Sequence, residues 1–592
     1  MRISLKIPPG LVGDDTSYDS AGRWRDGSNV RFWRGLAQTI GGWERLSDTA
    51  LSGVCRKVFP WTDNDATLNV AFGTHLTLEL WQGGALYDIT PTKARPAVTL
   101  GADPLTVVNG DATVSVAYAG HGFADGDEIT VSGATAVGGI TPNISTVEVT
   151  VVDVDTFTYE FSSNATSGAT GGGSAVVITP LAAFPAGAVD GTGGAGYGTG
   201  TYSTGTYSSP STEAFYPRTW SLSAYGEQLV ASPRGGAVYT WANDTGAEAE
   251  PLAGAPWQVT AALVSHTDQI FTLGCNEEVS GVFNALCIRH CGVRRPDQWN
   301  TAADTTAREY ILAGGGRIVG GVRMGQYLLV WTTDKLFVGT YVGSINQPWR
   351  FDPVGEKCGL AGPNAFAVAG SRVVWLAPDL QFRSYSLGGA VTIIPCPIRD
   401  DMAENLTVAQ ADKITANTIS VYDEVRFDYP DSRDGAENSR YVAVCLTDGA
   451  WSKGIMARSA FVDAGPQENP IGVDPDGNVF WHERGNSADG AAFSWFIESA
   501  DQLLAPDTVM LVRGVWPDIQ GQLGGVAVIV TTRYFPQGDE TSKTTGPLAP
   551  SEDKADFRIS GRLAKVKFSG NAAPTFARIG RPTFDVVPTS GR

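Results

Sequence analysis

The chain has 592 residues, and its 43 Lys and Arg against 62 Asp and Glu give a formal net charge of −19. This acidic balance excludes a protein whose main task is to grip nucleic-acid phosphates, because that task needs a basic surface, although DNA could still pass along a wall that repels it. The length exceeds what one compact core supports, and the 71 glycines and 33 prolines favour turns over helices, so several turn-rich domains are expected.

Neither the cysteines nor the apolar runs indicate secretion or a membrane. The seven cysteines are odd in number and scattered, which favours reduced thiols over a disulfide framework. The opening MRISLKIPPG lacks the apolar run of a signal peptide, and no stretch approaches the roughly eighteen apolar residues of a membrane helix. The sequence therefore predicts a soluble protein that is made in the cytoplasm, carries no export signal and does not insert stably into a membrane.

Residues 1–50 form a distinct first segment, in which arginine and tryptophan gather between residues 23 and 46. This run contains Arg23, Trp24, Arg25, Arg31, Phe32, Trp33, Arg34, Trp43 and Arg45, although the whole chain is acidic. One interpretation is a docking segment or platform, because Trp and Arg are favoured interface residues. The alternative is ordinary packing of a first β-hairpin with Gly41 and Gly42 as its turn, because aromatic-rich strands are common in cores.

Residues 51–102 predict the first unit of a repeating β structure. Within them, residues 54–89 divide into four apolar-rich pieces separated by Asp-Asn-Asp, Gly-Thr-His and Gly-Gly turns, as in one propeller blade. Related units occur in 216–497, at residues 220–241, 317–342, 364–385, 440–461 and 470–483. Their average spacing, near ~40–50 residues, is typical of propeller repeats. The sequence therefore predicts an all-β fold, a β-propeller with insertions; a set of unrelated β-sandwiches is the alternative.

Two insertions interrupt the predicted propeller. Residues 103–178 are rich in Val and Thr, nearly lack Lys and Arg, and alternate as in a small β-sandwich. Residues 179–215 follow as a Gly-rich arm or linker that contains the regularly spaced Tyr197, Tyr202 and Tyr207. Such composition usually gives a flexible linker, but tyrosine also supplies contact area at low entropy cost. The two interpretations are a linker and an ordered arm whose tyrosines contact a neighbouring subunit.

The last part of the chain combines one predicted helix with more strands. Residues 399–416, RDDMAENLTVAQADKITA, place Met402, Leu406 and Ala409 on one helical face. DPDGN at 474–478 resembles part of a calcium loop but lacks its closing Glu, so we interpret it as a hairpin turn. Residues 498–592 return to alternating strands, such as GVAVIVTTRYFP, and predict a separate β platform or sandwich.

Motifs for catalysis are scarce, and the sequence predicts neither an enzyme nor a cofactor site. It has no Gly-x-x-x-x-Gly-Lys-Ser/Thr phosphate loop, no Gly-x-Ser-x-Gly nucleophile elbow and no His-Glu-x-x-His pair among its five histidines. CIRHC offers Cys287, His290 and Cys291, but zinc usually needs a second ligand pair, for which only Cys275 is near. The segment also alternates like a strand that buries both of its cysteines on one face. No metal site is therefore predicted, while a glycosidase-type carboxylate pair stays open because only separation in space defines it.

Several stretches, taken in order along the chain, resemble one known family. They are IPPGLVGDDTSYDSAGRWRDGSNVRFWRGLAQTIGGWERL, TWSLSAYGEQLVASPRGGAVYTW, RRPDQWNTAADTTAREYILAGGGRIVGG, GLAGPNAFAVAGSRVVWLAPDLQFRSYS and ISGRLAKVKF. The set is similar to the packaged-DNA-stabilisation proteins of short-tailed bacteriophages, also called tail nozzle or tail hub proteins, over most of the chain outside 103–178. That insert is similar to a small β-module of many phage structural proteins, which is described as like the FCCH domain of ubiquitin-activating enzymes; this likeness concerns the fold alone.

The resemblance implies a structural virion protein of the phage tail. Members form a homo-oligomeric ring, usually of six subunits, beneath the portal and its adaptor, the head–tail connector ring. Each subunit carries a β-propeller and a platform of strands. The ring continues the channel for viral double-stranded DNA, which passes without sequence-specific binding, helps to retain the packaged genome until ejection, and offers surfaces for fibres, spikes or a needle. Two departures are the arginines at 289–295, where relatives are more acidic, and the insert, which is not universal in the family.

With this resemblance, the Arg- and Trp-rich run becomes a candidate contact with the adaptor or a neighbouring subunit. Tryptophans would anchor the contact and arginines would pair with carboxylates. The candidate interface residues are Arg23, Trp24, Arg31, Trp33, Arg34 and Trp43, and the candidate arm contacts are Tyr197, Tyr202 and Tyr207. The alternative function is a polysaccharide-degrading or host-glycan-binding β-propeller tail protein.

Overall fold

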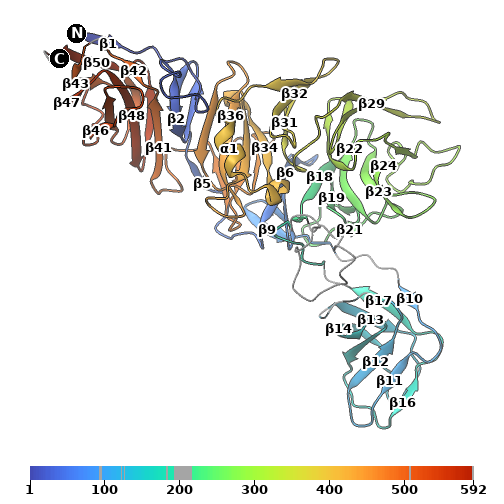
Figure 1. Cartoon of the computed structure of the whole chain (residues 1–592). Coiled ribbons are helices and arrows are strands. Elements are labelled where there is room, and N and C mark those ends of the chain that lie inside the picture. The colour runs from blue at the N-terminus through green and yellow to red at the C-terminus, as the bar shows by residue number, and fades with distance from the viewer. Residues whose placement is uncertain are drawn as a thin grey trace, which may run out of the picture.

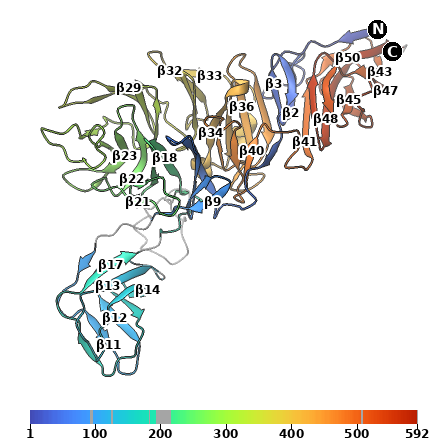
Figure 2. The ribbon, with the colours of Figure 1, turned by 180° about the vertical axis from the view of Figure 1, so that it is seen from behind.

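The structure, a computed structural model, describes residues 1–91, 97–121, 123, 125, 127–181, 184–191, 216–505 and 508–589. Its regular elements are almost all β-strands, most of them in four-stranded antiparallel sheets (Figure 1). A ring of sheets forms the centre, a second group of sheets holds both termini, and a small domain stands apart from both (Figure 2). The predicted fold class, a β-propeller with insertions, a strand platform and an inserted β domain, is confirmed.

Seven four-stranded antiparallel sheets of the described chain are the blades of the propeller. Blade 1 contains β6 (Cys55–Thr62), β7 (Leu68–Thr74), β8 (Leu78–Gln82) and β9 (Ala85–Asp88). Blade 2 contains β18 (Trp220–Tyr225), β19 (Gln228–Pro233), β20 (Tyr239–Trp241) and β21 (Glu250–Pro251). Blade 3 contains β22 (Val259–Val264), β23 (Ile270–Asn276), β24 (Phe283–His290) and β25 (Arg308–Ile311). Blade 4 contains β26 (Ile318–Met324), β27 (Tyr327–Thr332), β28 (Leu336–Tyr341) and β29 (Trp349–Gly355).

The remaining three blades complete the ring. Blade 5 contains β30 (Phe366–Ala369), β31 (Arg372–Leu376), β32 (Phe382–Ser386) and β33 (Thr392–Ile394). Blade 6 contains β34 (Thr415–Ile419), β35 (Glu424–Pro430), β36 (Asn438–Cys445) and β37 (Trp451–Ile455). Blade 7 contains β38 (Ala460–Val462), β39 (Ile471–Val473), β40 (Val479–His482) and, as its outermost strand, β5 (Trp43–Arg45). The first strand of blade 7 contacts that of blade 1, so the ring is closed.

The predicted repeat units match these blades unevenly. The four pieces at 54–89 are the four strands of blade 1, and the units at 220–241, 317–342 and 364–385 cover the first three strands of blades 2, 4 and 5. The units at 440–461 and 470–483 are not two blades. The first spans the end of blade 6 and the start of blade 7, and the second holds only β39 and β40.

Buried aromatic side chains pack the blades against one another. Trp331 of blade 4 stacks on Phe366 of blade 5 with ring centroids 5.1 Å apart, and it meets Trp375 edge-on at 5.7 Å. Each such ring removes a large apolar area from water, so these contacts stabilise the ring of blades. Glycines serve the hairpins between strands: Gly83 and Gly84 join β8 to β9 with φ of 60° and 89°, a conformation that most other residues resist.

The second group of sheets, which we call the platform, combines both ends of the chain. Its first sheet contains β1 (Arg2–Ser4), β50 (Thr583–Pro588), β43 (Met510–Trp516) and β47 (Ala555–Gly561). Its second contains β2 (Trp24–Ser28), β41 (Phe493–Ser499), β48 (Leu563–Ala572), β45 (Ala527–Arg533), β46 (Thr541–Thr544) and β42 (Gln502–Leu503). Its third contains β3 (Val30–Trp33), β4 (Leu36–Thr39), β49 (Phe576–Ile579) and β44 (Ile519–Leu523). The platform thus starts at β41, inside the interval expected to hold blades, and it also includes β1 to β4.

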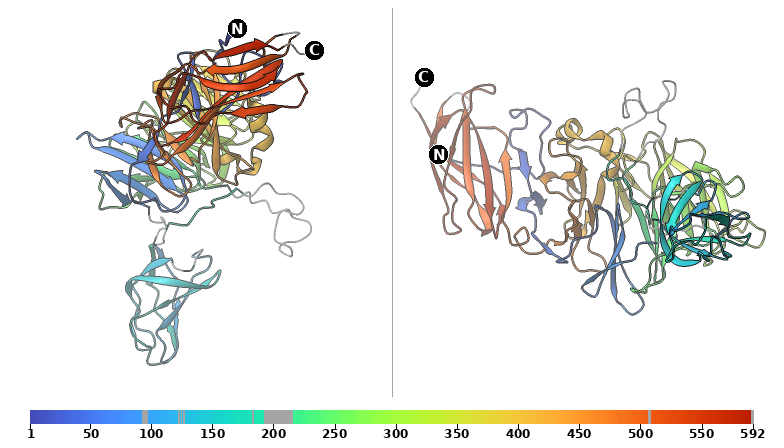
Figure 3. Two further views of the ribbon diagram at one scale, coloured as in Figure 1. Left: turned by 90° about the vertical axis from the view of Figure 1, so that its left-hand side faces the viewer. Right: turned by 90° about the horizontal axis from the view of Figure 1, so that it is seen from below.

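The inserted domain, between blades 1 and 2, is one eight-stranded antiparallel sheet curled around a single core. Its strands are β10 (Val98–Thr99), β11 (Leu105–Val107), β12 (Thr113–Ala117), β13 (Glu128–Ser132), β14 (Ile144–Asp153), β15 (Thr156–Glu160), β16 (Ala169–Gly171) and β17 (Val177–Leu181). The long β14 pairs with β13 along its first half and with β15 along its second, which turns one half of the sheet onto the other. Val116, Ile129, Phe157 and Ile178 meet in the core between the halves. Figure 3 shows the insert projecting away from the propeller and the platform.

The single helix predicted over 399–416 is wrong. α1 (Arg399–Asn405) ends after seven residues, a short 3-10 helix, η1 (Val408–Lys413), follows, and β34 then begins. Leu406 is extended with ψ of 128° and bridges to Asp431, while the Thr407 N–H donates to the Pro430 carbonyl at 3.0 Å. These contacts with blade 6 override the helical pattern. A second 3-10 turn, η2 (Ser420–Tyr422), joins β34 to β35, and no helix in the described ranges has the length and apolar character to cross a membrane.

Candidate functional site

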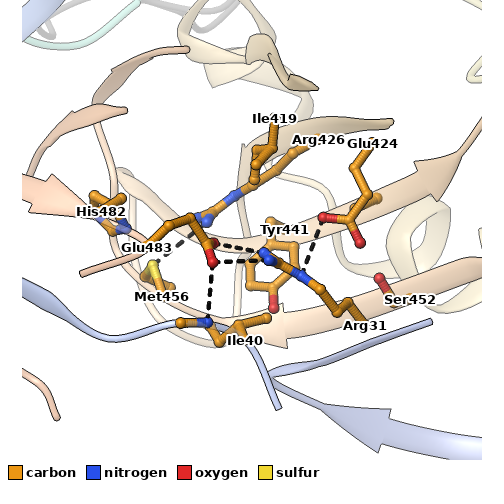
Figure 4. Close-up of a pocket in the computed structure, with 12 residues that line it drawn as sticks. Arg31, Ile40, Ile419, Glu424, Arg426, Tyr441, Ser452, Met456, His482 and Glu483 are labelled. Atoms are coloured by element: carbon orange, nitrogen blue, oxygen red, sulfur yellow. Dashed lines mark hydrogen bonds and ion pairs between the residues drawn. The ribbon is translucent and has the colours of Figure 1, made fainter. Parts of the chain in front are cut away.

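The Arg- and Trp-rich run passes from the platform into the propeller. β2, β3 and β4 lie in platform sheets, and β5 follows as the outer strand of blade 7. On the way, β2 and β3 also pack against β37, the edge strand of blade 6. We call the cluster of ionisable side chains that lines a small cavity where this run meets blades 6 and 7 the seam; its members are Arg31, Glu424, Arg426, His482 and Glu483 (Figure 4). The seam joins residues that lie up to 452 positions apart in the chain.

Arg31 is the centre of the seam. Its guanidinium donates two hydrogen bonds to Glu483, from Nη1 to Oε2 at 2.8 Å and from Nη2 to Oε1 at 2.6 Å, and its Nε lies 3.3 Å from Glu424 Oε2. Its Cζ also lies 3.7 Å from the centroid of the Tyr422 ring. The Arg31 side chain is only 2% exposed. Because a two-point pairing fixes both distance and direction, it holds β3 in one position relative to blades 6 and 7.

Two further buried arginines lie near this pairing. Arg426 donates from Nε to Asp428 Oδ1 at 3.0 Å. Arg458 donates from Nε to His482 Nε2 at 2.8 Å, so that ring nitrogen is an acceptor and carries no proton. The region therefore contains three buried guanidinium groups, each with a different acceptor.

Burial alters the protonation of these groups. It raises the pKa of Glu424 to about 7, although Arg31 acts in the opposite direction. Burial alone would lower the pKa of Arg31, but Glu424 and Glu483 outweigh it and raise that pKa. Burial, and after it the charge of Arg458, holds the pKa of His482 well below its usual 6.5. Near pH 7 the seam therefore holds a charged Arg31, a neutral His482 and a Glu424 that is about half protonated.

The cavity at the seam is too small for a substrate. Its volume is about 10 Å³, which is room for about one water molecule. A glycosidase places its two carboxyl groups on either side of a sugar, roughly 5–10 Å apart. Glu424 and Glu483 instead contact the same guanidinium group. These carboxylates hold Arg31 in place, and the space between them offers no site for catalysis.

Glu424→Gln is expected to remove a pH-dependent part of the protein's stability. In the wild type, Glu424 binds a proton more tightly when folded, with a pKa of about 7, than in the unfolded chain, where the ordinary value is 4.5. The resulting stabilisation is complete below pH 4.5 and is lost as the pH rises through 7, by up to about 3 kcal/mol. Gln has no such proton, so the stability of the variant relative to wild type should increase between pH 5 and pH 8.

Chemical denaturation at several pH values measures this difference. The contribution of His482, which runs in the opposite direction because its pKa is lowered, is common to both proteins and cancels. A matched change at the exposed Glu468, Glu468→Gln, should leave the wild-type pH curve unchanged. A stability difference between Glu424→Gln and wild type that is the same at pH 5 and pH 8 would contradict the assignment.

The interface prediction is wrong for Trp24 and Arg31. Trp24 is 2% exposed and lies in the main hydrophobic core, and the Arg31 guanidinium is occupied by the seam, so neither reaches a partner. Arg23 is half-buried, and its backbone carbonyl accepts a hydrogen bond from the Ala500 N–H at 2.9 Å. For Trp24 and Arg31, the alternative of packing within the chain describes what is found, whereas the contact proposed for the Arg23 side chain stays a prediction.

The other three candidates lie closer to the surface. Arg34 is exposed at the β3–β4 turn, where it and Gly35 have φ of 51° and 76°. Its Cζ is 5.4 Å from the ring of the half-buried Trp33. Trp43 is half-buried and stacks on His482 with ring centroids 5.8 Å apart. Arg34 and Trp33 thus remain available as a candidate contact, whereas Trp43 serves the closure of blade 7.

The predicted hairpin turn at Gly41 and Gly42 is also wrong, because the turn of that hairpin is at Arg34 and Gly35. Gly41 and Gly42 instead mark the place where the chain passes close to the backbone of residues 483–487. The arm residues Tyr197, Tyr202 and Tyr207 lie outside the described residues, so their contacts stay a prediction.

CIRHC covers the end of β24 in blade 3 and the residue after it, Cys291, and the predicted burial of its cysteines is confirmed. Cys287 and Cys291 are both fully buried in one core cluster, and Cys275 Sγ lies 3.8 Å from Cys287 Sγ. His290 Nδ1 lies 2.9 Å from the Cys291 carbonyl oxygen, and its ring stacks on Tyr310 with ring centroids 5.8 Å apart. Among the described residues, no three or more His, Cys, Asp or Glu side chains gather in a way that could hold a metal ion.

A second buried ion network, which the sequence did not reveal, joins blade 1 to blade 6. Arg56 Nη2 donates to Glu437 Oε1 at 2.7 Å and Nη1 to Oε2 at 2.5 Å. Lys413 Nζ lies 2.7 Å from the same Oε1 and 2.6 Å from Asp190 Oδ1. These two blades lie on either side of blade 7, whose outermost strand is β5. The network therefore connects the two neighbours of blade 7.

Comparisons with known proteins find similar structures but no family. No protein-family model matches the chain, and no curated protein matches it. Among solved structures, BamB from Moraxella catarrhalis is 14% identical and covers 47% of this chain and 79% of its own, with a TM-score of 0.27. Phage phi92 endosialidase is 10% identical and covers 71% and 63%, with a TM-score of 0.20; Hsv2 from Kluyvelomyces marxianus is 7% identical and covers 56% and 97%, with a TM-score of 0.28. Similarity at this level concerns the β-propeller fold alone and carries no argument about function.

Proposed function

We propose that the chain is a structural, non-catalytic subunit of a bacteriophage virion, a tail nozzle or tail hub. Copies of it form a ring, of six subunits by the sequence resemblance, below the portal–adaptor complex. The ring continues the channel for viral double-stranded DNA, helps to retain the packaged genome until ejection, and offers attachment surfaces for fibres, spikes or a needle. The protein is made in the cytoplasm of the bacterial host, resides in the phage tail and needs no cofactor.

The observation that best supports this proposal is the seam. It gathers buried charges from the platform, blade 6 and blade 7 around a cavity of only about 10 Å³. Buried pairs of this kind hold one geometry more than they add stability. A fixed angle between platform and propeller suits a subunit that must keep its shape in a ring under pressure from packed DNA.

The charge of the chain fits a channel through which DNA moves. A net charge of −19 gives the subunit the same sign as DNA, and a channel wall of that sign would repel the duplex and prevent it from sticking. Retention then depends on a closed ring and a plug, and tight phosphate contacts are not required.

The larger cavities do not favour polysaccharide cleavage. Two cavities of about 400 and 420 Å³ could each admit a small ligand. Within the described part of the chain, neither is lined by Asp or Glu, whereas glycoside hydrolysis commonly requires a pair of carboxyl groups. A clearing assay on host capsule or lipopolysaccharide should therefore give no activity.

Mass measurement tests the proposal. The purified full chain is expected to form a closed ring, alone or only with the adaptor ring of the same phage, and six copies of a 62.5 kDa chain have a mass of about 375 kDa. A chain that stays a monomer both with and without the adaptor would contradict the proposal.

A charge reversal at Arg34 tests the candidate contact within this assembly. Arg34→Glu should weaken adaptor binding or ring formation at least tenfold, because the exposed Arg34 and its neighbour Trp33 are the candidate interface residues that a partner can reach. Arg350→Glu on blade 4, also exposed, is the matched control and should assemble normally. Equal assembly of both variants would remove Arg34 from the interface.

A further inference from the structure

The centre of the propeller contains a cavity of about 420 Å³. It is lined by β6, β18, β22, β26, β34 and β38 and by the start of blade 5, so each of the seven blades contributes to its wall. Its volume lies within the range of ligand sites in proteins. The lining is mostly apolar and includes the half-buried rings of Phe59 and Phe366.

The charged groups of this cavity are all cationic. Lys57 and Arg323 line it, and no Asp or Glu of the described residues does. Lys57 Nζ donates to Asn364 Oδ1 at 3.2 Å across the ring from blade 5, and no carboxylate in the described ranges lies within ion-pair distance of it. Its neighbour in sequence, Arg56, by contrast donates from both Nη atoms to Glu437. Lys57 therefore keeps unused donors beside an apolar space.

Polar groups that accept or donate hydrogen bonds lie near Lys57. Asn364 holds its place by donating from Nδ2 to the Arg56 carbonyl at 3.3 Å. Asn417 also lines the cavity and donates from Nδ2 to Thr415 Oγ1 at 3.2 Å. The amides are thus fixed by the inner strands of the blades, which gives a ligand a preformed set of partners.

We propose that the central cavity binds a small organic anion, with Lys57 facing its carboxylate or phosphate group and the aromatic lining side chains holding its apolar part. Lys57 is half-buried, and an anion bound beside it would supply the counter-charge that the described lining of the cavity lacks. The proposal concerns a site inside one subunit, so it is independent of ring assembly and of the proposed function.

The protonation of Lys57 agrees with this site. Burial lowers the pKa of Lys57 to about 8. A bound anion would favour the charged amine and raise this pKa, so binding should be accompanied by proton uptake near pH 8.

Calorimetric titration of the full chain with benzoate and with phenylphosphonate tests the proposal, because both carry an aromatic body and an anionic group. Benzamide, which has the same body without the charge, is the control ligand. The anions are expected to bind and benzamide to bind at least tenfold more weakly. Lys57→Gln should weaken anion binding at least tenfold, whereas Lys543→Gln, at an exposed lysine of β46, should not change it.

A second measurement uses the wild-type chain, so it does not depend on the folding of the variant. Bound benzoate or phenylphosphonate should slow the acetylation of Lys57 by acetic anhydride, read by peptide mass spectrometry, and should leave Lys543 unaffected. The proposal is overturned if neither anion binds, if benzamide binds as tightly, if Lys57→Gln binds within threefold of wild type, or if the anions do not protect Lys57.

Discussion

Replacing Glu483 with alanine is expected to destabilise the protein by about 3–5 kcal/mol, because it removes the two-point acceptor of a buried arginine. Arg31 cannot escape by losing its proton, since a guanidinium stays charged at any ordinary pH. Glu424 is its one remaining carboxylate partner in the described structure, at 3.3 Å from Nε. We therefore expect platform and propeller to loosen from each other, which hydrogen exchange in β3 and β37 would report together with the free energy of unfolding.

Two further variants test whether the expected destabilisation comes from the buried pairing of Arg31. Glu44→Ala breaks an ion pair with Arg484 of similar length, 2.8 Å, but both side chains are about half exposed, so the expected change is below about 1 kcal/mol. Arg31→Met should cost less at pH 6 than at pH 8, because the glutamates left behind can take up protons. If Glu483→Ala is no more destabilising than Glu44→Ala, the seam does not hold the two parts together.

Gly42→Ala is expected to separate β5 from blade 7 and to cost about 3 kcal/mol or more. A Cβ at this position would lie 2.5 Å from the Ser487 carbonyl oxygen and 2.6 Å from its nitrogen. Both are backbone atoms that cannot rotate away, so the strand itself must move. The movement would break the hydrogen bond from the Trp43 N–H to the Ser487 carbonyl, now 3.0 Å, and with it the alignment of β5 on β40.

Hydrogen exchange of the amides in β5 and β40 checks this prediction, since an open blade 7 exposes them while the platform sheets stay protected. Gly101→Ala is the matched control, because an added Cβ there meets no atom within 4 Å. Unchanged protection of β5 in Gly42→Ala would contradict the view that the close backbone approach at Gly42 is needed to hold this strand on blade 7.

The parts of the fold that local pattern decides could be predicted from the sequence. The four strands of blade 1 follow from apolar runs separated by glycine and asparagine turns, and DPDGN is the predicted hairpin turn, with Asp474 Oδ1 accepting from the Asp476 and Asn478 N–H groups. The helix at 399–416 was predicted wrongly because its periodic residues are pulled into contacts with blade 6, which no local pattern encodes.

The seam and the position of β5 could not be predicted, because both depend on contacts between residues that lie far apart in the chain. β5 has only three residues, Trp-Glu-Arg, too few to show alternation, and its partner β40 follows more than four hundred residues later. The run stands out in the sequence, but the acceptors of Arg31 do not, because Glu424 and Glu483 are two ordinary glutamates among many. The one signal in the sequence is an arginine-rich run in an acidic chain, because arginines that become buried need carboxylate partners. Lys57 is equally hidden in the sequence, since only the closed ring shows that no Asp or Glu of the described residues lines the cavity beside it.

Electron cryomicroscopy of the assembled phage particle tests the central claim most directly. The account predicts density for this chain in a ring around the tail axis below the adaptor, with platform and propeller at the angle that the seam fixes. Density for the chain away from the axial channel, or no copy of it in the particle, would contradict the account.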